Sequence, residues 1–262
     1  MNGSSDIERL VLSSRRLPTA FSGLRILHLS DLHIIRWTRR LERWREALSA
    51  LRIDLMVITG DIGHRSWHWK ASLDGVVRLV SDIAAPLGKF FILGNHDALE
   101  LGPALHDRGL IPLMNASYIL RKGANEMALV GLAQHKRIDT DIPAALAEVP
   151  PATFKLMLMH YPDLIHAAAA AEIDICLAGH THGGQICYPD GSPIIRHDVL
   201  PNYMCTGVHK VASTWLVVNR GIGKAGLRVR MFCPPHAIVL KLQTGEDGIE
   251  LAPEQAPGRL SN

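Results

Sequence analysis

Histidine, aspartate and asparagine recur in this sequence directly after short apolar runs. They form five motifs: Asp31-Leu32-His33, Gly60-Asp61, Gly94-Asn95-His96-Asp97, His160 and Gly179-His180-Thr181-His182. Imidazole, carboxylate and amide groups without thiolate suit Mn, Fe or Zn ions. A single structural zinc ion needs only about four ligands, whereas these motifs offer seven or more candidates. The residue types therefore indicate two metal ions, about 3.5–4 Å apart, that hold one phosphoryl group.

The spacing of two pairs adds to this interpretation. Asp31 and His33, like His180 and His182, are separated by one residue. In extended backbone, side chains at positions i and i+2 leave on the same side. Adjacent glycines allow sharp turns and a close approach to a ligand. We therefore expect each pair to point from an extended segment into one cavity.

The apolar runs before the motifs predict buried strands. The predicted strands are residues 25–29, 55–59, 90–93, 127–132, 156–159 and 175–178, followed by 214–218 and 237–242. Helical periodicity predicts helices at residues 41–51, 73–83 and 162–171. This alternation favours an α/β layered fold. The motifs lie at the carboxyl ends of the strands, where open α/β sheets bind ligands.

Composition limits the class of protein. The 262 residues are 47% hydrophobic and 20% charged, which excludes an intrinsically disordered chain. We predict one domain over residues 1–262, with 1–22 as an extension or first strand and 245–262 as a flexible tail. The net charge of +3 is too small to argue for nucleic acid. None of the four cysteines forms a Cys-x-x-Cys pair, so we expect buried, reduced thiols.

No run in the sequence approaches the roughly 18 apolar residues of a membrane-spanning helix. The amino end also lacks the apolar segment of a signal peptide. We therefore expect a cytoplasmic protein, with peripheral contact at the inner face of the membrane as a further expectation.

The five motifs, in this order and at strand ends, resemble those of the calcineurin-like metallophosphoesterase family over about residues 25–185. The resemblance implies a four-layer α/β/β/α sandwich with a dinuclear metal site at the carboxyl ends of the strands. It implies that the first ion is held by Asp31, His33 and His182, and the second by Asn95, His160 and His180, with Asp61 bridging both.

The resemblance also implies a catalytic role for His96, which would stabilise the phosphoryl oxygens or protonate the leaving group. Asp97 would orient the His96 ring.

A related family branch often carries an acidic residue where this chain has the sequence Gly131-Leu132-Ala133-Gln134. His28 lies inside a predicted strand, and we expect its ring to form a hydrogen bond in the core.

Two segments beside the motifs carry arginine and tryptophan. The candidate substrate-binding residues there are Arg36, Arg65, Trp67 and Trp69. Such groups suit a membrane interface and anionic headgroups, and the two tryptophans could equally stack on a nucleobase. The alternative is a solvated basic helix with Trp44 in the core.

The resemblance implies a metal-dependent phosphodiesterase or diphosphatase that uses two divalent ions, manganese first and iron or zinc as alternatives. The extended motif at residues 179–185, with Arg220-Gly221-Ile222-Gly223 downstream, looks like a bacterial branch of small phosphodiesterases. Some members of that branch act on lipid-linked diphosphates such as UDP-2,3-diacylglucosamine. The alternatives are a nuclease or cyclic nucleotide phosphodiesterase, and a non-catalytic membrane-surface scaffold. A scaffold usually loses ligands or the catalytic histidine, and none is missing from this sequence.

Overall fold

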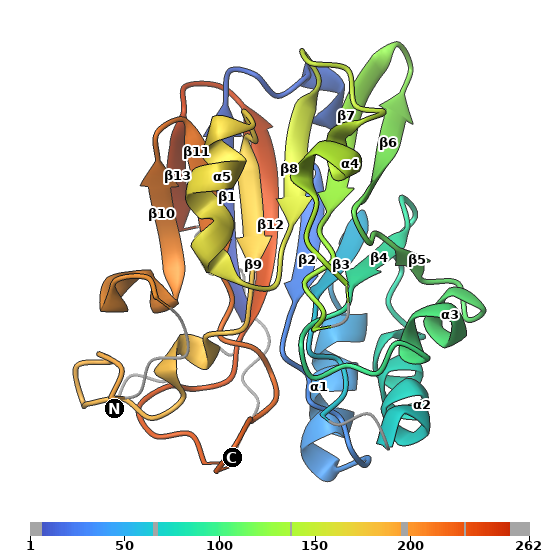
Figure 1. Cartoon of the computed structure of the whole chain (residues 1–262), viewed down its shortest axis with the longest axis vertical. Coiled ribbons are helices and arrows are strands. Elements are labelled where there is room, and N and C mark those ends of the chain that lie inside the picture. Colours follow the sequence, from blue (N-terminus) through green and yellow to red (C-terminus); the bar gives the residue numbers. More distant parts are fainter. Residues whose placement is uncertain (1–6, 65–67, 137, 195–198, 228, 252–262) are drawn as a thin grey trace.

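The computed structural model describes residues 7–64, 68–136, 138–194, 199–227 and 229–251. Two β-sheets lie face to face, and helices cover the outer side of each sheet (Figure 1). The layer order is therefore helix, sheet, sheet, helix, which confirms the α/β/β/α sandwich that the family resemblance implies.

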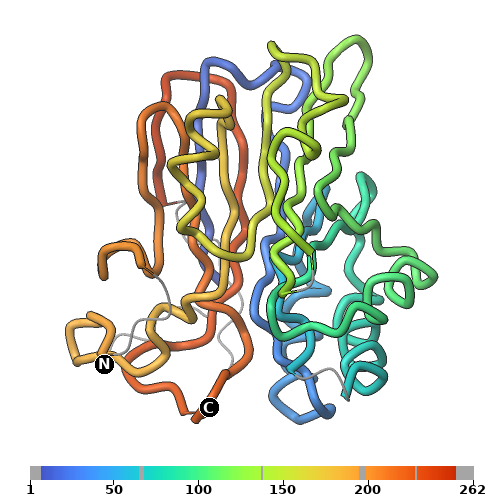
Figure 2. The backbone as a smooth tube through the Cα atoms, in the orientation of Figure 1, coloured from blue at the N-terminus to red at the C-terminus, as the bar shows by residue number. Residues whose placement is uncertain are grey.

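Seven strands form the first sheet, in the order β13-β1-β12-β2-β3-β4-β5. Their bounds are Ile7–Ser14 (β1), Arg25–Leu29 (β2), Leu55–Thr59 (β3), Lys89–Ile92 (β4), Ile111–Pro112 (β5), Ala237–Thr244 (β12) and Gly248–Leu251 (β13). The strands from β2 to β5 are parallel, whereas β12 is antiparallel to β2. β1 and β12, from opposite ends of the chain, run parallel and side by side (Figure 2).

Six strands form the second sheet, in the order β10-β11-β9-β8-β7-β6. Their bounds are Ala116–Lys122 (β6), Asn125–Gly131 (β7), Phe154–Leu158 (β8), Ile175–Ala178 (β9), Gly207–Val211 (β10) and Thr214–Val218 (β11). The four central strands are parallel, and β6 and β10 form antiparallel edges. As a result, β8 and β9 end on the same side of their sheet.

The helices are amphipathic and cover the outer faces of the sheets. Their bounds are Arg39–Ser49 (α1), Trp69–Val80 (α2), Leu101–His106 (α3), Ile142–Leu146 (α4) and Ile165–Ala170 (α5), with short 3-10 turns at Thr19–Phe21 (η1), Pro162–Leu164 (η3), His182–Gly184 (η4) and Asn202–Cys205 (η5). α1 begins after Thr38, whose side chain accepts a hydrogen bond from the Leu41 N–H at 3.2 Å. Leu41, Trp44 and Leu48 then bury one face of α1.

Three hydrophobic clusters hold the layers together, and β3 shows how one strand serves two of them. Met56 and Ile58 pack in the cluster under α1 and α2, whereas Leu55 and Val57 pack between the two sheets. This alternation follows from the two-residue period of a strand. The third cluster lies between the second sheet and helices α4 and α5.

The strands β2, β3, β9 and β11 have the bounds that the sequence predicts, and the other predicted strands differ by a few residues. One expectation is wrong: residues 248–251, assigned to a flexible tail from 245, pair with β1 as strand β13. β13 is short, half-exposed and at a sheet edge, so it carries no apolar run that could predict it. In the described part of the chain, no helix is long and apolar enough to cross a membrane.

Candidate metal centre

The five motifs meet at one end of the sandwich because β2, β3 and β4 end there in the first sheet and β8 and β9 in the second. Backbone pairing continues past the strand ends: the Asp31 N–H donates to Gly60 O at 3.0 Å, and the His33 N–H donates to Asp61 O at 3.0 Å. These bonds fix the loop after β2 against the loop after β3. The backbone that carries Asp31, His33 and Asp61 is therefore held in place.

Two groups of candidate ligands result. One contains Asp31, His33 and His182, the other contains Asp61, His160 and His180, and the ligand atoms within each group lie within 4.8 Å of one another. The groups are adjacent because Asp61 Oδ2 lies 3.5 Å from His33 Nε2 and 3.4 Å from His160 Nε2. Asp61 thus stands between the two groups, as a bridging ligand would.

The spacing of the ligand atoms fits metal ions. His33 Nε2 lies 3.0 Å from His182 Nε2, and Asn95 Oδ1 lies 3.1 Å from His160 Nε2. Metal bonds of about 2.0–2.2 Å place neighbouring ligands of one ion roughly 3.0–3.5 Å apart. Asn95 therefore belongs with the second group.

The tautomer of His160 is set by the backbone. Its Nδ1 lies 2.9 Å from Thr59 O, and a carbonyl oxygen only accepts, so Nδ1 carries the proton. The lone pair of Nε2 is then available to an ion, as is usual for histidine ligands whose other nitrogen is held by a carbonyl.

The buried carboxylates of this site favour a bound positive charge. Asp31 is fully buried, and its Oδ1 has no hydrogen-bond partner among the described residues. Burial raises the pKa of Asp31 to about 6. Burial alone would also raise the pKa of Asp61, but His160 and His33 outweigh it and lower that pKa. A cation between these groups would satisfy the orphaned oxygen, so the residues fit the implied ions.

The backbone at the candidate ligands is unusual. Positive φ angles occur at Asp31 (48°), His33 (43°), Asp61 (50°), His180 (69°) and His182 (52°). Residues other than glycine rarely adopt this left-handed conformation, and each costs of order 1 kcal/mol or more. The expectation of extended backbone at the two i, i+2 pairs is therefore wrong. Left-handed turns, not strand alternation, aim these side chains into the site.

The two i, i+2 pairs are distributed differently between the ligand groups. Asp31 and His33 lie in one ligand group, whereas His180 and His182 lie in different groups. Three contacts hold the Asp31 carboxylate and its surroundings: Ser30 Oγ donates to Asp31 Oδ2 at 2.6 Å, and the His180 N–H donates to the same oxygen at 2.9 Å. The third is the packing of Gly179 against Ser30, which leaves no room for a Cβ.

His96 lies beside the ligand groups without joining either. Its ring centroid is 5.5 Å from that of His33, and its backbone N–H donates to Asp61 Oδ1 at 2.9 Å. The Asp97 carboxylate, which we expect to orient the His96 ring, also has backbone partners. Its two carboxylate oxygens accept from the N–H groups of Gly63 and Gly94, at 2.6 and 2.8 Å. The Asp97 side chain therefore joins two strand-end loops.

Gln134 and His64 contact the candidate ligands, and the sequence patterns assigned neither of them a role in the site. Gln134 Oε1 accepts from the N–H groups of His160 and Tyr161, which fixes the loop after β8. The departure from the family pattern at this position was the only signal in the sequence. His64 is buried, its ring stacks on that of His96 with centroids 5.9 Å apart, and its Nδ1 lies 3.2 Å from His33 Nδ1.

Two of the four residues of the predicted arginine and tryptophan rim lie within the described residues. Arg36 is exposed, but Trp69 is half-buried and packs against the cluster under α1 and α2. Arg65 and Trp67 lie outside the described residues. His28 is buried and its Nε2 lies 2.8 Å from Thr59 Oγ1, which confirms a hydrogen-bonded core histidine.

Comparison with known proteins agrees with this geometry. The calcineurin-like phosphoesterase family model matches residues 24–184. An uncharacterized metallophosphoesterase, YkuE of Bacillus subtilis (strain 168), is 29% identical over 249 residues, covering 89% of this chain and 84% of that protein. The phosphodiesterase YaeI of Escherichia coli (strain K12) is 29% identical over 241 residues, covering 83% and 82%.

A third relative has a named substrate. The UDP-2,3-diacylglucosamine pyrophosphatase LpxG of Chlamydia muridarum (strain MoPn / Nigg) is 25% identical over 297 residues, and the match covers 86% of each protein. The family match spans more than half of this chain and contains all five motifs. The chain therefore belongs to the calcineurin-like phosphoesterase family and is a phosphoric ester hydrolase.

Proposed function

We propose that this chain hydrolyses a phosphodiester or diphosphate bond with two divalent metal ions. The observation that carries the proposal is the position of Asp61 Oδ2 between the two ligand groups, 3.5 Å from His33 Nε2 and 3.4 Å from His160 Nε2. One carboxylate shared by two groups suits two neighbouring cations that clamp a phosphoryl group.

The proposed ligands divide between the ions as the two groups divide. They are Asp31, His33 and His182 for one ion and Asn95, His160 and His180 for the other, with Asp61 bridging. When bound, such ions lower the pKa of water from 15.7 towards about 7 and polarise the phosphoryl oxygens. We propose Mn²⁺ as the working ion, with Fe²⁺ and Zn²⁺ as the alternatives that nitrogen and oxygen ligands also accept.

His96 is the proposed proton donor. In the overall reaction, water adds its oxygen to phosphorus, the bond from phosphorus to the leaving oxygen breaks, and the leaving oxygen gains a proton. The His96 imidazole is half-buried and lies beside both His33 and His64. A positioned donor of this kind contributes about 10²–10⁴-fold to the rate.

The proposed substrate class is a lipid-linked diphosphate. LpxG, by its name, acts on UDP-2,3-diacylglucosamine, and it matches most of this chain. Exposed hydrophobic side chains near the metal centre support the same class. Eight of the ten large hydrophobic residues that are exposed in the described chain come from two loops: Tyr188, Ile194, Val199 and Tyr203, and Leu227, Val229, Met231 and Phe232.

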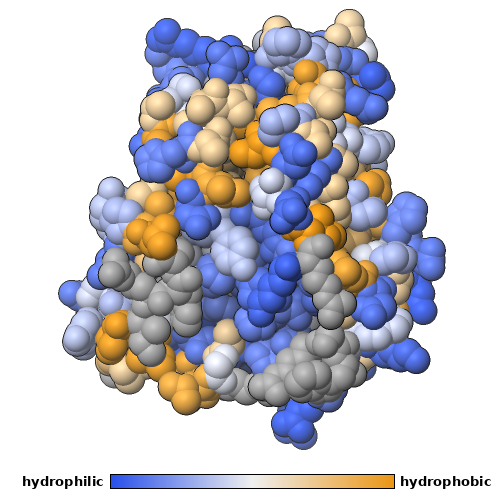
Figure 3. All heavy atoms as spheres, viewed as in Figure 1, coloured by the Kyte–Doolittle hydropathy of each residue, from blue (hydrophilic) through white to orange (hydrophobic). Residues whose placement is uncertain are grey.

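These two segments, called here the apolar loops, are held side by side. The Cys187 N–H donates to Met231 O at 2.9 Å, and the Met231 N–H donates to Gln185 O at 3.0 Å. The Gln185 side chain also bonds both the N–H and the C=O of Ala225, each at 2.8 Å. Because Gln185 follows His182 by three residues, the apolar loops adjoin the metal centre. Figure 3 shows hydrophobic side chains at the lower left of the molecule, beside a hydrophilic hollow.

We propose that the apolar loops contact a bilayer that contains anionic lipids. Residues 224–233 carry three basic side chains and no acidic one, and aromatic residues with basic neighbours suit the membrane interface. Hydrophobic patches of this kind mark interaction sites on soluble proteins. Peripheral contact would bring a lipid-linked substrate to the metal ions without a membrane-spanning segment.

The hydrolase proposal is tested with bis(p-nitrophenyl) phosphate. Protein supplied with Mn²⁺ should release p-nitrophenol, EDTA should abolish the release, and Fe²⁺ and Zn²⁺ are compared in parallel. Absence of turnover with all three ions would overturn the proposal. Linear DNA and cyclic nucleotides are assayed beside a diphosphate diester, and faster cleavage of either would favour the nuclease or cyclic nucleotide alternative.

The membrane proposal is tested by co-sedimentation with vesicles of phosphatidylcholine, with and without phosphatidylglycerol. Wild-type protein should pellet with the anionic vesicles, and the double variant Leu227→Ser/Phe232→Ser should lose most of that binding. Leu251→Ser is the matched control, since Leu251 is as exposed as Leu227 (73% and 74%) but lies on β13. Equal binding by all three proteins, or self-association that the double variant abolishes, would overturn membrane contact.

A further inference from the structure

A buried histidine outside the candidate ligand set, His64, lies behind the first ligand group. Its segment follows Asp61 and runs beside the segment after β2, because the Ile34 N–H donates to Ile62 O at 3.0 Å. The His64 residue is only 8% exposed. Its ring centroid is 5.2 Å from that of His33, with the two ring planes at 73°. A hydrogen bond joins the two Nδ1 atoms, which are 3.2 Å apart.

The position of His33 determines which of these nitrogens donates. His33 Nε2 faces the candidate ligands, 3.0 Å from His182 Nε2 and 3.5 Å from Asp61 Oδ2. A histidine that binds a metal ion is neutral and carries one ring proton. An ion at Nε2 therefore leaves the proton on Nδ1, so that His33 Nδ1 donates and His64 Nδ1 accepts. Metal-binding histidines usually donate this proton to a carboxylate, a carbonyl or water, and here an imidazole takes that place.

The second ligand group is supported in a different way. His160 Nδ1 lies 2.9 Å from Thr59 O, so its outer partner is a backbone carbonyl. Such outer partners fix the tautomer and the orientation of the ring and make it a stronger ligand. At His33 the outer partner is a side chain. Substitution can therefore remove the support of one ligand group and leave that of the other intact.

Further contacts hold the segment that carries His64. The Gly63 N–H donates to Asp97 Oδ1 at 2.6 Å, which ties this segment to the loop after β4. A Cβ at Gly63 would lie 3.0 Å from Ser72 Oγ, which belongs to α2. The ring of His64 is nearly parallel to that of His96, with the planes at 12° and the centroids 5.9 Å apart. The acceptor nitrogen therefore has a set position behind the first ligand group.

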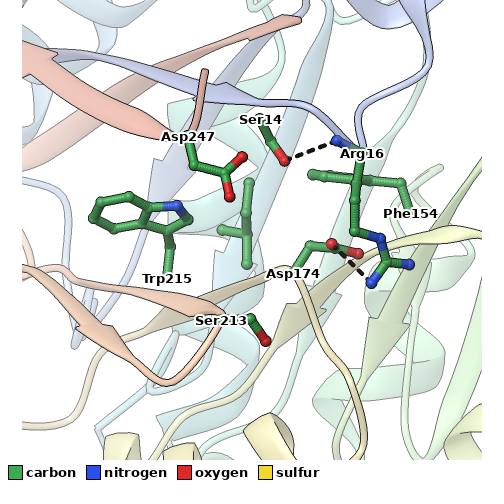
Figure 4. Close-up of a pocket in the computed structure, with 8 residues that line it drawn as sticks. Ser14, Arg16, Phe154, Asp174, Ser213, Trp215 and Asp247 are labelled. Carbon is green, nitrogen blue, oxygen red and sulfur yellow. Dashed lines mark hydrogen bonds and ion pairs between the residues drawn. The ribbon is translucent and has the colours of Figure 1, made fainter. Parts of the chain in front are cut away.

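A polar contact beside a cavity does not by itself support a metal ion. A cavity of about 50 Å³ lies at the amino ends of β8 and β9, at the opposite ends of these strands from the ligand groups. Arg16 meets Asp174 there at 3.3 Å (Figure 4). None of the described residues that line this cavity is a candidate ligand. The His64 contact differs because it ends on a residue of the first ligand group.

We propose that His64 is a positioning residue for the first metal ion: its Nδ1 accepts a hydrogen bond from His33 Nδ1 and so keeps His33 Nε2 directed at the ion. This inference rests on the proposed function, which supplies the two ions. His64 acts through His33 and contacts neither the ions nor the substrate. The two ions are thus held with different outer partners, a replaceable side chain for the first and the backbone for the second.

Calorimetric titration with Mn²⁺ tests the proposal on two variants of His64. His64→Leu removes the acceptor and should weaken the binding of one ion about 10- to 100-fold, as loss of an outer partner does, while the other ion is unchanged. His64→Asn should keep both ions, because the amide oxygen of asparagine takes the place of ring Nδ1 and accepts the same hydrogen bond. Anomalous scattering from crystals of His64→Leu at limiting Mn²⁺ should show the lost ion to be the one beside Asp31.

Two controls lie outside the metal centre. Arg16→Met removes the ion pair with Asp174, and His209→Leu removes an imidazole contact with Thr206 O at 2.8 Å. Both variants should bind two ions as the wild type does. Tight binding of both ions by His64→Leu, equal losses in His64→Leu and His64→Asn, or loss of the second ion in place of the first would overturn the proposal.

A measurement on the wild-type protein keeps the proposal testable even if His64→Leu does not fold. Zn²⁺-loaded protein labelled with ¹⁵N in its histidines should show a proton on His33 Nδ1 and none on His64 Nδ1 by nuclear magnetic resonance. The spectrum of His64→Asn assigns the His64 signals. Wild-type protein that binds no divalent ion would overturn the proposed function. Two bound ions with the proton on His64 Nδ1 would overturn this inference alone.

Discussion

The metal centre and the apolar loops are neighbours in which the usual distribution of side chains is reversed. In the metal centre, Asp31, Asp61 and His160 are almost completely buried, although such groups normally face water. In the loops, Val199 and Leu227 are 83% and 74% exposed, although such groups normally lie inside. Most of the buried polar groups are matched by one another and by backbone hydrogen bonds, and the Asp31 Oδ1 atom that is not would be satisfied by a metal ion. The exposed apolar groups lie on the loops that we propose to contact a bilayer.

Substitution of Asp61 should have the largest effect and should distinguish the metal centre from the apolar loops most clearly. Asp61→Asn removes the carboxylate that stands between the ligand groups, so we expect loss of bound metal and a fall in kcat of more than about 1,000-fold. Loss of even an outer hydrogen-bond partner of a ligand costs about 10–100-fold. Metal content measured by mass spectrometry checks this. Asp190→Asn, in the exposed hairpin of the first loop, is the control and should keep full metal content.

His96 should separate metal binding from chemistry within the centre. His96→Ala should keep both ions and lower kcat by about 100-fold or more, because a positioned proton donor supplies about 10²–10⁴-fold. Metal content and kcat are measured on the same preparation. His106→Ala, at the end of α3, should behave as wild type. Loss of metal from His96→Ala would mean that His96 is a ligand and not a proton donor.

A glycine substitution should reveal the tight packing of the centre as a loss of stability. A Cβ at Gly94 would collide with Asp61, so Gly94→Ala should lower the free energy of unfolding by about 1–3 kcal/mol. Gly102→Ala, inside α3 with only Leu93 at 3.6 Å, should instead raise it by up to about 1 kcal/mol. Urea denaturation of the three proteins checks both signs. Equal stability of all three would show that the strand-end loops yield more easily than their contacts indicate.

The smallest effect is expected in the apolar loops. Leu227→Ser and Val199→Ser should each change the free energy of unfolding by no more than about 0.5 kcal/mol, since exposed side chains contribute little to the fold. Thermal denaturation in the absence of lipid is the measurement. A loss above about 2 kcal/mol in either variant would mean that the loop side chain is buried in solution, and the contrast between the two regions would disappear.

Sequence patterns were sufficient where a strand is buried on both faces. β2, β3 and β9 carry continuous apolar runs, and their bounds were predicted without error. β6, β10 and β13 were not predicted, because edge strands are half-exposed and mix polar with apolar residues. Such a pattern does not distinguish a strand from a loop.

In the metal centre, the residue types indicated a metal site, but they did not predict the backbone conformation of the candidate ligands. Asp31-x-His33 was read as extended, whereas both residues adopt left-handed φ angles. Those angles result from contacts with loops distant in sequence, such as Gly223 against Asp31, which local spacing does not encode. The support of His160 by Gln134 was missed for the same reason. Hydrogen bonds between loops that are distant in sequence can be identified only in the folded structure.

The left-handed backbone at five candidate ligands limits which side chains could replace them. Each of these residues carries a backbone strain of order 1 kcal/mol. Aspartate, asparagine and histidine adopt this conformation more often than other residues, whereas a β-branched residue there is strongly strained. A redesigned ligand set would therefore have to suit the turn as well as the metal ion.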